Sequence, residues 1–467
     1  LQQRSLRKFI DQALSLVERD QLLEELLPNQ LSAFYQLPEL LPSLLRVHKP
    51  TPAEAARFED SPHRARLVLE ELLGHRLALL ERKDQRMAIP AKPCPPNAPL
   101  HQRFMAALPY QPTNAQARVL SEIQQDLERS EPMHRLVQGD VGAGKTLVAA
   151  MAAIPVLAAG HQVAVMAPTE ILAEQHLKAF SAWFEPLGYT VDWFSGSQKV
   201  SQRKPAQQRL AQGECHIAVG THALFQDAVV FHDLGLVIVD EQHRFGVHQR
   251  LALTDKAGDT RPHQLIMTAT PIPRTLAMSM YADLDLSVID ELPPGRTPID
   301  TRVLSTQKRD AVAARIQNLV AQGGQAYWIC TLVEDSEHLA AKAAETSHEW
   351  LQSALPNLGI GLVHGRMSSD EKQAAMDDFK QLKTQVLVAT TVIEVGVDVP
   401  NANLIVIENA ERLGLAQLHQ LRGRVGRGAR ASFCLLMYDS PLSENGQARL
   451  ETLRASNDGF VIAEKDL

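Results

Sequence analysis

From about residue 101 onward, the apolar positions fall in short, β-branched runs that alternate with stretches of helical periodicity. This alternation predicts an α/β fold, in which a parallel sheet is covered by helices. A helix is expected at residues 171–184. The strands expected in this first series are residues 135–138, 162–167, 191–194, 216–220, 234–239 and 264–268.

A second α/β series follows the Pro/Gly-rich run LPPGRTP at 292–298. Because proline and glycine interrupt regular structure, this run is expected to be a hinge between two lobes. We therefore expect one lobe at 101–291 and another at 292–440. The strands expected in the second lobe are residues 325–330, 359–364, 385–389, 404–407 and 432–437.

The N-terminal stretch, up to about residue 89, has a helical pattern. Ser61-Pro62 provides an N-cap and a first-turn proline, and leucines at 67, 72, 73, 77 and 80 then recur at helical spacing. Five prolines between residues 90 and 99 predict an extended connector. Residues 1–100 are thus expected to form a helical connector segment with a proline-rich end. A packing or spacer role is favoured over a catalytic one.

Charge, cysteine content and hydropathy limit the class of protein and the compartment in which it works. The 47 basic and 54 acidic side chains give a net charge of −7, which excludes a histone-like polycation but not a nucleic-acid partner. The four cysteines are more than a hundred residues apart, which favours buried free thiols in a reducing cytoplasm. The most apolar run, 147–159, is too short to cross a membrane and contains Pro155. The chain begins with Leu1 instead of Met, so we expect that a preceding portion is missing.

The clearest chemical signal is the run GDVGAGKT at 139–146, which follows an expected strand and precedes an apolar helix. Gly139, Gly142 and Gly144 allow backbone N–H groups and the helix N-terminus to surround phosphates. Lys145 is expected to neutralise the β- and γ-phosphates, and the Thr146 hydroxyl to bind Mg²⁺. This pattern in this context predicts a nucleoside triphosphate site.

Two acids follow an apolar strand in the run LVIVDEQH at 236–243. Asp240 would hold Mg²⁺ through its water shell, and Glu241 would orient or deprotonate the attacking water. Such a pair is weak evidence alone, because ordinary strands also end in acids. Beside a phosphate loop it becomes a strong indication of hydrolysis.

The second lobe contains the arginine-rich run QLRGRVGR at 420–427. Runs of this kind are usually solvated surfaces. Here, however, Arg424 and Arg427 each follow a glycine, so little backbone bulk hinders their approach to a ligand. Arginines suit the charge that spreads over a phosphoryl transition state. Their position on the other lobe would make hydrolysis depend on lobe closure.

Together these elements resemble superfamily 2 helicases, most closely the bacterial RecG branched-DNA helicases, over residues 101–467. The rival family, the translocase module of the transcription-repair coupling factor, has similar motifs. Gln242 and the C-terminal run NDGFVIAEKDL favour RecG. The motifs that carry the resemblance are residues 139–146, 167–170, 220–224, 240–247, 268–275, 389–398 and 417–427.

The resemblance implies two RecA-like lobes and further site residues. Gln116 would read adenine, Thr268 and Thr270 would couple hydrolysis to lobe movement, and Asp398 would contact the nucleotide. Residues 441–467 would begin a C-terminal translocation motif. The expected contacts to the DNA backbone are Thr169, Thr221, His364 and Thr390. For each threonine, a hydroxyl satisfied by a local backbone group remains the alternative.

The resemblance also implies the cofactors and partners. ATP with Mg²⁺ would drive the motor on branched double-stranded DNA (stalled forks and four-way junctions) in recombination and repair. A single-strand-binding protein is a further candidate partner, no membrane association is expected, and a monomer is the default. RecG proteins also carry an N-terminal wedge domain and a longer translocation motif, so the chain is expected to be a central fragment with a blunted preference for branched DNA. A non-translocating, ATP-gated DNA clamp and an RNA remodeller remain alternatives.

Overall fold

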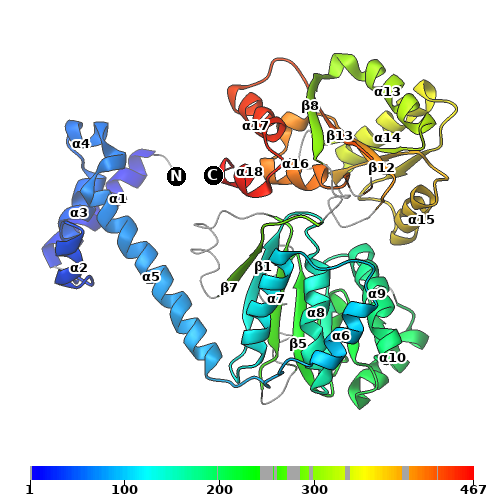
Figure 1. Cartoon of the computed structure of the whole chain (residues 1–467). Coiled ribbons are helices and arrows are strands. Elements are labelled where there is room, and N and C mark those ends of the chain that lie inside the picture. The colour runs from blue at the N-terminus through cyan, green and yellow to red at the C-terminus, as the bar shows by residue number, and fades with distance from the viewer. Residues whose placement is uncertain are drawn as a thin grey trace. The chain divides into compact units, whose positions relative to one another are not determined.

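The computed structural model describes residues 3–20, 22–196, 198–241, 256, 260–270, 284–293, 298–331, 337–391, 399–426, 428 and 430–466. The chain divides into two compact units, Leu1–Arg86 and Met87–Leu467. The first is helical, as expected, and the second contains two parallel β-sheets (Figure 1).

In the first unit, the long helix α5 begins at Pro62, as the Ser61-Pro62 pair predicted. Its Arg66 side chain is fully buried and forms ion pairs with Glu25 and Glu70. These ion pairs connect α5 to the segment between α1 and α2, because an unpaired buried guanidinium would be very costly. The helices of this unit are α1 (Gln3–Asp20), α2 (Asn29–Phe34), α3 (Leu40–His48), α4 (Pro52–Ala56) and α5 (Pro62–Met87).

The first lobe of the second unit is built on a seven-stranded parallel sheet in the order β3-β4-β2-β5-β6-β1-β7. Its described helices are α6 (Ala98–Ala106), α7 (Asn114–Leu127), α8 (Lys145–Ala158), α9 (Glu170–Phe184) and α10 (Val200–Gln212). The strands are β1 (His134–Gly139), β2 (Gln162–Met166), β3 (Val191–Phe194), β4 (Ile217–Gly220), β5 (Leu234–Asp240), β6 (His263–Thr268) and β7 (Asp285–Ile289).

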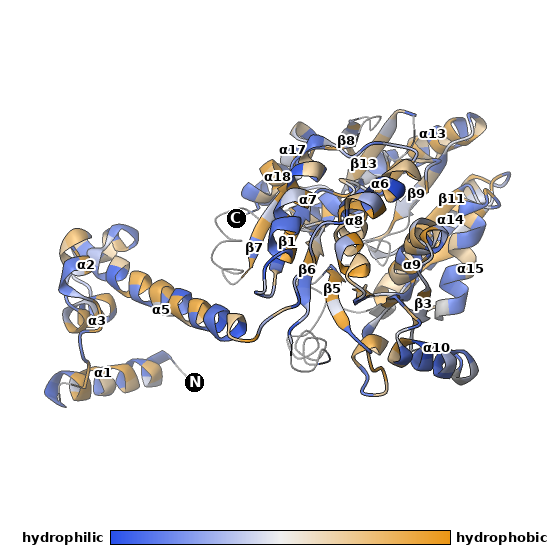
Figure 2. Cartoon of the chain, turned by 60° about the horizontal axis from the view of Figure 1, so that its bottom comes forward, coloured by the Kyte–Doolittle hydropathy of each residue, from blue (hydrophilic) through white to orange (hydrophobic). Residues whose placement is uncertain are grey.

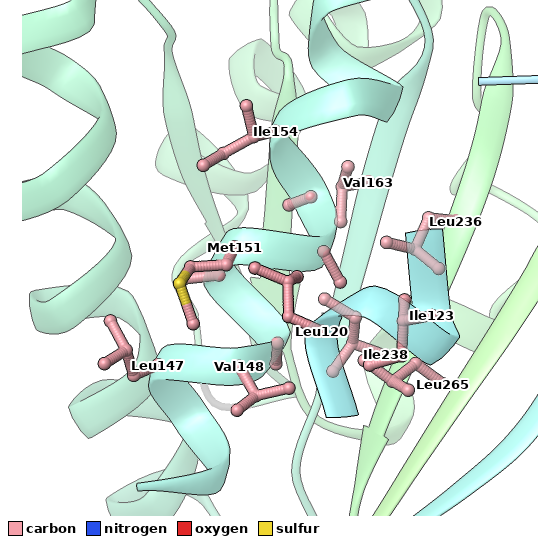
Figure 3. Packing of buried hydrophobic residues seen from close by; sticks show 14 of the residues in the cluster. Leu120, Ile123, Leu147, Val148, Met151, Ile154, Val163, Leu236, Ile238 and Leu265 are labelled. Atoms are coloured by element: carbon pink, nitrogen blue, oxygen red, sulfur yellow. The ribbon is translucent and has the colours of Figure 1, made fainter. Parts of the chain in front are cut away.

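Helix α8 lies at the centre of this lobe's core. Eleven consecutive residues from Leu147 to Leu157 are buried, and four of them are alanines that allow neighbouring elements to approach closely. Leu120 and Ile123 of α7 pack against it together with side chains of the sheet (Figure 3). Figure 2 shows α8 in largely hydrophobic colours and α10 in hydrophilic ones. The helix that follows the phosphate loop is therefore held rigidly on all sides.

The second lobe has a six-stranded parallel sheet in the order β10-β11-β9-β12-β13-β8. Arg309 at the start of α13 lies 4.1 Å from the ring centroid of Trp350 and pairs with Glu408, which closes one side of its core. The described helices are α13 (Arg309–Ala321), α14 (Glu337–Ala354), α15 (Ser369–Lys380), α16 (Leu415–Arg422), α17 (Glu444–Ala455) and α18 (Gly459–Glu464). The strands are β8 (Ile299–Ser305), β9 (Gln325–Ile329), β10 (Ile360–Val363), β11 (Val386–Ala389), β12 (Ala402–Ile407) and β13 (Ser432–Tyr438).

All the expected strands are present, with ends shifted by no more than two residues. Strands β7 and β8 were not expected from the sequence. Each lies at the edge of its sheet and pairs with a single neighbour, β1 or β13. These two strands have polar side chains exposed to solvent, such as Asp285 in β7 and Arg302 in β8, so they lack the continuous apolar run that marks a central strand.

The proline-rich connector is fixed to the first lobe instead of running free. Ala91 N donates to Ser130 O and Cys94 N donates to Leu127 O, both at 2.7 Å. The backbone carbonyl of Lys92 also lies 3.0 Å from His263 Nε2. Residues 87–100 thus belong to the second compact unit, although their composition grouped them with the N-terminal segment.

Candidate nucleotide site and DNA-contact residues

The phosphate loop connects β1 to α8, as the sequence predicted. Gly142 and Gly144 have φ values of +79° and +82°, in the left-handed region that favours glycine. Gly144 also lies directly against Gln116, because a Cβ at this position would be 2.2 Å from Gln116 Nε2. The glycines therefore provide both the curvature of the loop and its close contact with α7.

Lys145 points back into the loop that it follows. Its Nζ donates to the carbonyl oxygens of Gly139 at 2.7 Å and Asp140 at 2.9 Å. Burial lowers the pKa of Lys145, and the carboxylates of Glu241, Asp240 and Asp140 oppose that shift. A buried ammonium encircled by loop carbonyls is well placed to exchange them for phosphate oxygens.

The paired acids occupy the end of β5. His176 Nε2 lies 2.8 Å from Asp240 Oδ2, which fixes that carboxylate from α9. Glu241 has a φ of +51°, unusual for a non-glycine residue, and its backbone N–H donates to Met267 O. Burial, reinforced by the neighbouring Asp240 carboxylate, raises the pKa of Glu241 to about 7. This carboxylate is therefore far easier to protonate than an exposed one.

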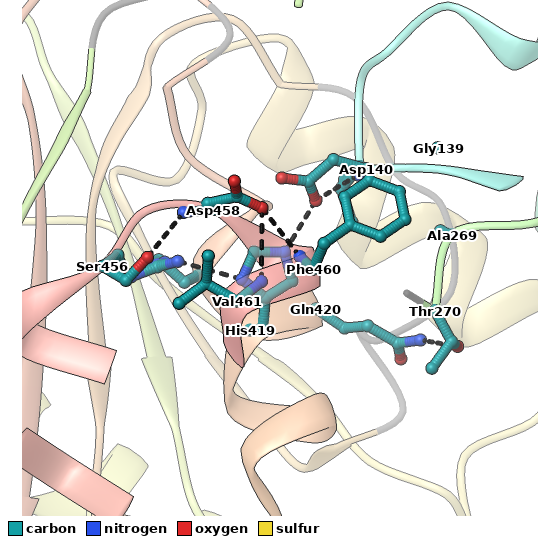
Figure 4. Close-up of polar contacts among 12 residues, drawn as sticks. Gly139, Asp140, Ala269, Thr270, His419, Gln420, Ser456, Asp458, Phe460 and Val461 are labelled. Carbon is teal, nitrogen blue, oxygen red and sulfur yellow. Dashed lines mark hydrogen bonds and ion pairs between the residues drawn. The ribbon is translucent and has the colours of Figure 1, made fainter. Parts of the chain in front are cut away.

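The Glu241 side chain also reaches the next strand. Its Oε1 accepts a hydrogen bond from Ala269 N at 3.3 Å, and Thr270 N donates to Thr268 Oγ1. Gln420 Nε2 of the second lobe donates to Thr270 Oγ1 at 2.6 Å (Figure 4). The segment 268–270 thus contacts both the acidic pair and the second lobe.

The arginine-rich run of the second lobe lies against the phosphate loop. Arg424 is 5% exposed, and its positive charge is close enough to lower the pKa of both Lys145 and Glu241. A Cβ on Gly423 would be 2.7 Å from Val141 Cβ, so the two lobes meet backbone to side chain here. The structure therefore brings Arg424 together with Lys145 and Glu241. Arg427 and Asp398 lie outside the described residues.

One arginine of the run has a different environment. Arg422 is 2% exposed, and its Nη1 donates to the carbonyls of Leu453 at 2.8 Å and Ser456 at 2.7 Å. Its Nη2 contacts His419, which in turn contacts Asp140 of the phosphate loop (Figure 4). The sequence analysis missed His419 and Asp140. A histidine three positions before an arginine gives no periodic signal that separates this contact from ordinary packing.

Gln116 is buried and its amide is already bonded. Its Oε1 accepts from Thr113 N at 2.9 Å in a capping box at the start of α7. Its Nε2 donates to Ala143 O in the phosphate loop at 2.8 Å. Gln116 thus links α7 to the nucleotide loop, whereas its reading of adenine stays a prediction.

The expected DNA-contact residues lie at the carboxyl ends of strands. Thr169 follows β2 and Thr221 follows β4, which are adjacent in the first sheet. His364 follows β10 and Thr390 follows β11, adjacent in the second. In parallel sheets these ends share one edge, where ligands commonly bind. The four residues therefore form one pair in each lobe.

The side chains of these four residues differ in their hydrogen-bond and ion-pair partners. Thr169 Oγ1 accepts from Leu172 N at 3.4 Å as the N-cap of α9, which is the local alternative for this hydroxyl. The hydroxyls of Thr221 and Thr390 are buried and have no hydrogen-bond partner among the described residues. His364 Nε2 lies 3.6 Å from Glu345. The contact of all four with DNA stays a prediction.

Within the described part of the chain, no helix is both long and apolar enough to cross a membrane. The described residues likewise hold no group of three or more His, Cys, Asp or Glu side chains that could bind a metal. All four cysteines are buried and unbridged, as expected.

Two family matches coincide with the two lobes. Residues 113–279 match the DEAD/DEAH box helicases, and residues 308–429 match the conserved C-terminal helicase domain. S. cerevisiae Dbp5 bound to RNA and ADP BeF3 shares the fold, with a TM-score of 0.56 at 17% identity over 78% of this chain and 91% of that one. Fold and site thus define a two-lobed, ATP-driven helicase.

The chain is 57% identical to the ATP-dependent DNA helicase RecG of Escherichia coli K12 and 56% identical to that of Haemophilus influenzae. Both alignments cover all of this chain and 68% of the relative. A structure of RecG bound to a three-way DNA junction has a TM-score of 0.82 and 37% identity, over 100% of this chain and 61% of that one. The chain belongs to the RecG family of ATP-dependent DNA helicases.

Proposed function

We propose that this chain uses ATP hydrolysis to move along duplex DNA and to remodel branched DNA, including forks and four-way junctions. One observation carries the proposal. Gly423 of the second lobe lies directly against Val141 of the phosphate loop, and the adjacent Arg424 is buried with its charge acting on Lys145 and Glu241, so both lobes contribute charge to one site. Hydrolysis at a shared site can change the contact between the lobes, which a site within one lobe would not do directly.

The residues present fit a nucleoside triphosphate. The loop has two left-handed glycines and a buried lysine bonded only to backbone carbonyls in its described contacts, which suits an anion with many oxygens. Lys145 would hold the β- and γ-phosphates, and Gln116 would contact the base. Thr146 and Asp240 would hold Mg²⁺ through hard oxygen atoms, the ligands that this ion prefers, and the ion would supply positive charge that partly neutralises the phosphates.

Glu241 is proposed to position the attacking water and accept its proton. A pKa of about 7 allows it to take up and release a proton near neutral pH. Its hydrogen bond from Ala269 N couples any change in its charge to the segment containing Thr268 and Thr270. Arg424, with Arg427, would stabilise charge on the transferred phosphoryl group. Asp398 would complete the nucleotide contacts from the second lobe.

The DNA contacts are proposed for Thr169 and Thr221 in one lobe and His364 and Thr390 in the other. A pair on each lobe would let the lobes bind the backbone alternately as the contact between them changes. The branched substrate is proposed from the RecG relative bound to a three-way junction. Backbone contacts carry no base sequence, so binding should be sequence-independent and weaken with salt. The monomeric state and a single-strand-binding protein as partner remain predictions.

Glu241→Gln tests this proposal. The variant should bind ATP with near-normal affinity, measured by titration with a fluorescent analogue, and hydrolyse it at least about a hundredfold more slowly. Glu185→Gln, an exposed carboxylate in the same lobe, is the matched control and should hydrolyse normally. Near-normal turnover in Glu241→Gln would remove this residue from catalysis.

A second comparison tests the substrate. ATPase and strand-displacement rates should rise more with branched DNA than with linear duplex or RNA. Slow hydrolysis without displacement would instead indicate a clamp, and stimulation by RNA alone would indicate an RNA remodeller.

A further inference from the structure

The histidine His419 connects the phosphate loop to the second lobe. His419 of α16 places its Nε2 2.7 Å from Oδ1 of Asp140, the second residue of the loop (Figure 4). The same carboxylate oxygen accepts the backbone N–H of Val141 at 2.6 Å. The two side chains are 4% and 19% exposed, so little water competes for this contact. It is a largely desolvated hydrogen bond to a charged group, which is the stronger kind.

The other ring nitrogen settles the protonation of His419. Its Nδ1 lies 2.9 Å from Nη2 of Arg422, and a guanidinium has only donors. Nδ1 must therefore accept, and the ring proton must be on Nε2, where it is donated to Asp140. The imidazole is thus neutral and bridges a carboxylate of one lobe to a guanidinium of the other. Arg422 is itself fixed by the carbonyls of Leu453 and Ser456, at the C-terminal end of α17.

We propose that His419 is a positioning residue that keeps the phosphate loop and α16 in the arrangement that places Arg424 at the catalytic site. Arg424 lies five residues after His419 and just past the end of α16, so a shift of the helix moves it directly. On the other side, Lys145 donates to the backbone carbonyl of Asp140 itself. The contact thus fixes Asp140 by its side chain while Lys145 holds its backbone. This inference rests on the proposed nucleotide site.

Two substitutions test the two hydrogen bonds of His419, to Asp140 and from Arg422, separately. In His419→Asn, the amide oxygen can replace Nδ1 and keep Arg422, but the side chain is too short to donate to Asp140. In His419→Gln, the longer amide can replace Nε2 and keep Asp140, but the acceptor for Arg422 is lost. We expect His419→Asn to lower kcat for ATP about ten- to hundredfold, with KM and analogue binding within about threefold of wild type. His419→Gln should keep kcat within about threefold.

Asp140→Ala tests the same contact from the other lobe, also if His419→Asn does not fold. It should lower kcat as much as His419→Asn does, and the double variant should be no slower than the slower single variant. His161→Ala is the control, because it removes an imidazole–carboxylate contact of 2.8 Å, to Asp233, within the first lobe. It should leave kcat within about twofold.

Several outcomes would overturn the proposal: normal kcat in His419→Asn, equal losses in the Asn and Gln variants, or losses that multiply in the double variant. Failure of the wild-type chain to bind or hydrolyse ATP would instead refute the proposed function, before any variant is compared.

Discussion

The backbone of Gly423 in the second lobe lies directly against the Val141 side chain of the phosphate loop, and Gly423→Ala should measure how much hydrolysis depends on that approach. The added Cβ would lie 2.7 Å from Val141 Cβ and 3.0 Å from each of its methyl carbons, whereas ordinary contacts are 3.4–4 Å. Gly423 has φ −64° and ψ −4°, which alanine adopts without strain. The effect must therefore come from the contact with the phosphate loop and not from the backbone.

The size of the effect follows from these distances. Restoring ordinary contact requires the loop and the arginine-rich run to separate by about 0.7–1 Å, because Val141 Cβ is not the end of a flexible side chain. A misplacement of about 1 Å at reacting groups can cost about a hundredfold in rate. We expect kcat for DNA-stimulated ATP hydrolysis to fall about ten- to hundredfold, while ATP affinity changes little because Lys145 and its loop stay intact.

Steady-state ATPase assays with branched DNA, alongside analogue titration, provide the measurement. Gly414→Ala is the matched control, since it lies at the other end of the same helix with nothing within 4 Å of its Cβ, and should stay near wild-type activity. Val141→Gly removes all three clashing atoms and should restore part of the rate in Gly423→Ala. Full activity in Gly423→Ala, or no recovery with Val141→Gly, would show that hydrolysis does not depend on this contact between the lobes.

Three further predictions concern the loop and the core. Gly144→Ala should abolish ATP binding in analogue titration, because it combines a φ of +82° with a Cβ 2.2 Å from Gln116 Nε2; measurable affinity within tenfold of wild type would contradict this. Arg309→Ala should destabilise the second lobe by about 2 kcal/mol in thermal unfolding, since it removes the guanidinium stacked on Trp350, and Arg309→Lys should recover only part of that loss. Phe379→Ala, at a fully buried position, should cost about 3–5 kcal/mol, and a loss below 1 kcal/mol would indicate that the core refills the cavity.

The sequence predicted best what depends on neighbouring residues. Central strands such as β5 are covered on both faces, so their apolar runs locate them directly. The phosphate loop could likewise be identified, because Gly142 and Gly144 must adopt left-handed φ values that few other residues tolerate. Strands β7 and β8 could not be found, since the exposed polar residues Asp285, Asp300 and Arg302 leave them without a continuous apolar run.

Contacts between segments that are far apart in the sequence could not be predicted from it. Arg422 and Arg424 are two positions apart in one run, yet Arg422 binds carbonyls at the C-terminal end of α17 and Arg424 lies at the nucleotide loop. Which of these environments each arginine occupies depends on how the lobes pack, and no pattern of neighbouring residues predicts that packing. Thr169 illustrates the reverse case, because its hydroxyl bonds a nearby backbone group as the N-cap of α9, which is the local alternative that its sequence had left open.

Each sheet joins strands from opposite ends of its lobe. β1, the first strand of the first lobe, lies between β6 and β7, which are made last, and β8 pairs only with β13. Such long-range pairing delays folding, because a wide loop must close before the pairing contacts form. On the ribosome, the strand that leads into the phosphate loop cannot find its partners until residue 289 has emerged. A newly made chain must therefore keep its apolar Leu136 and Val137 from aggregating for some 150 further residues of synthesis.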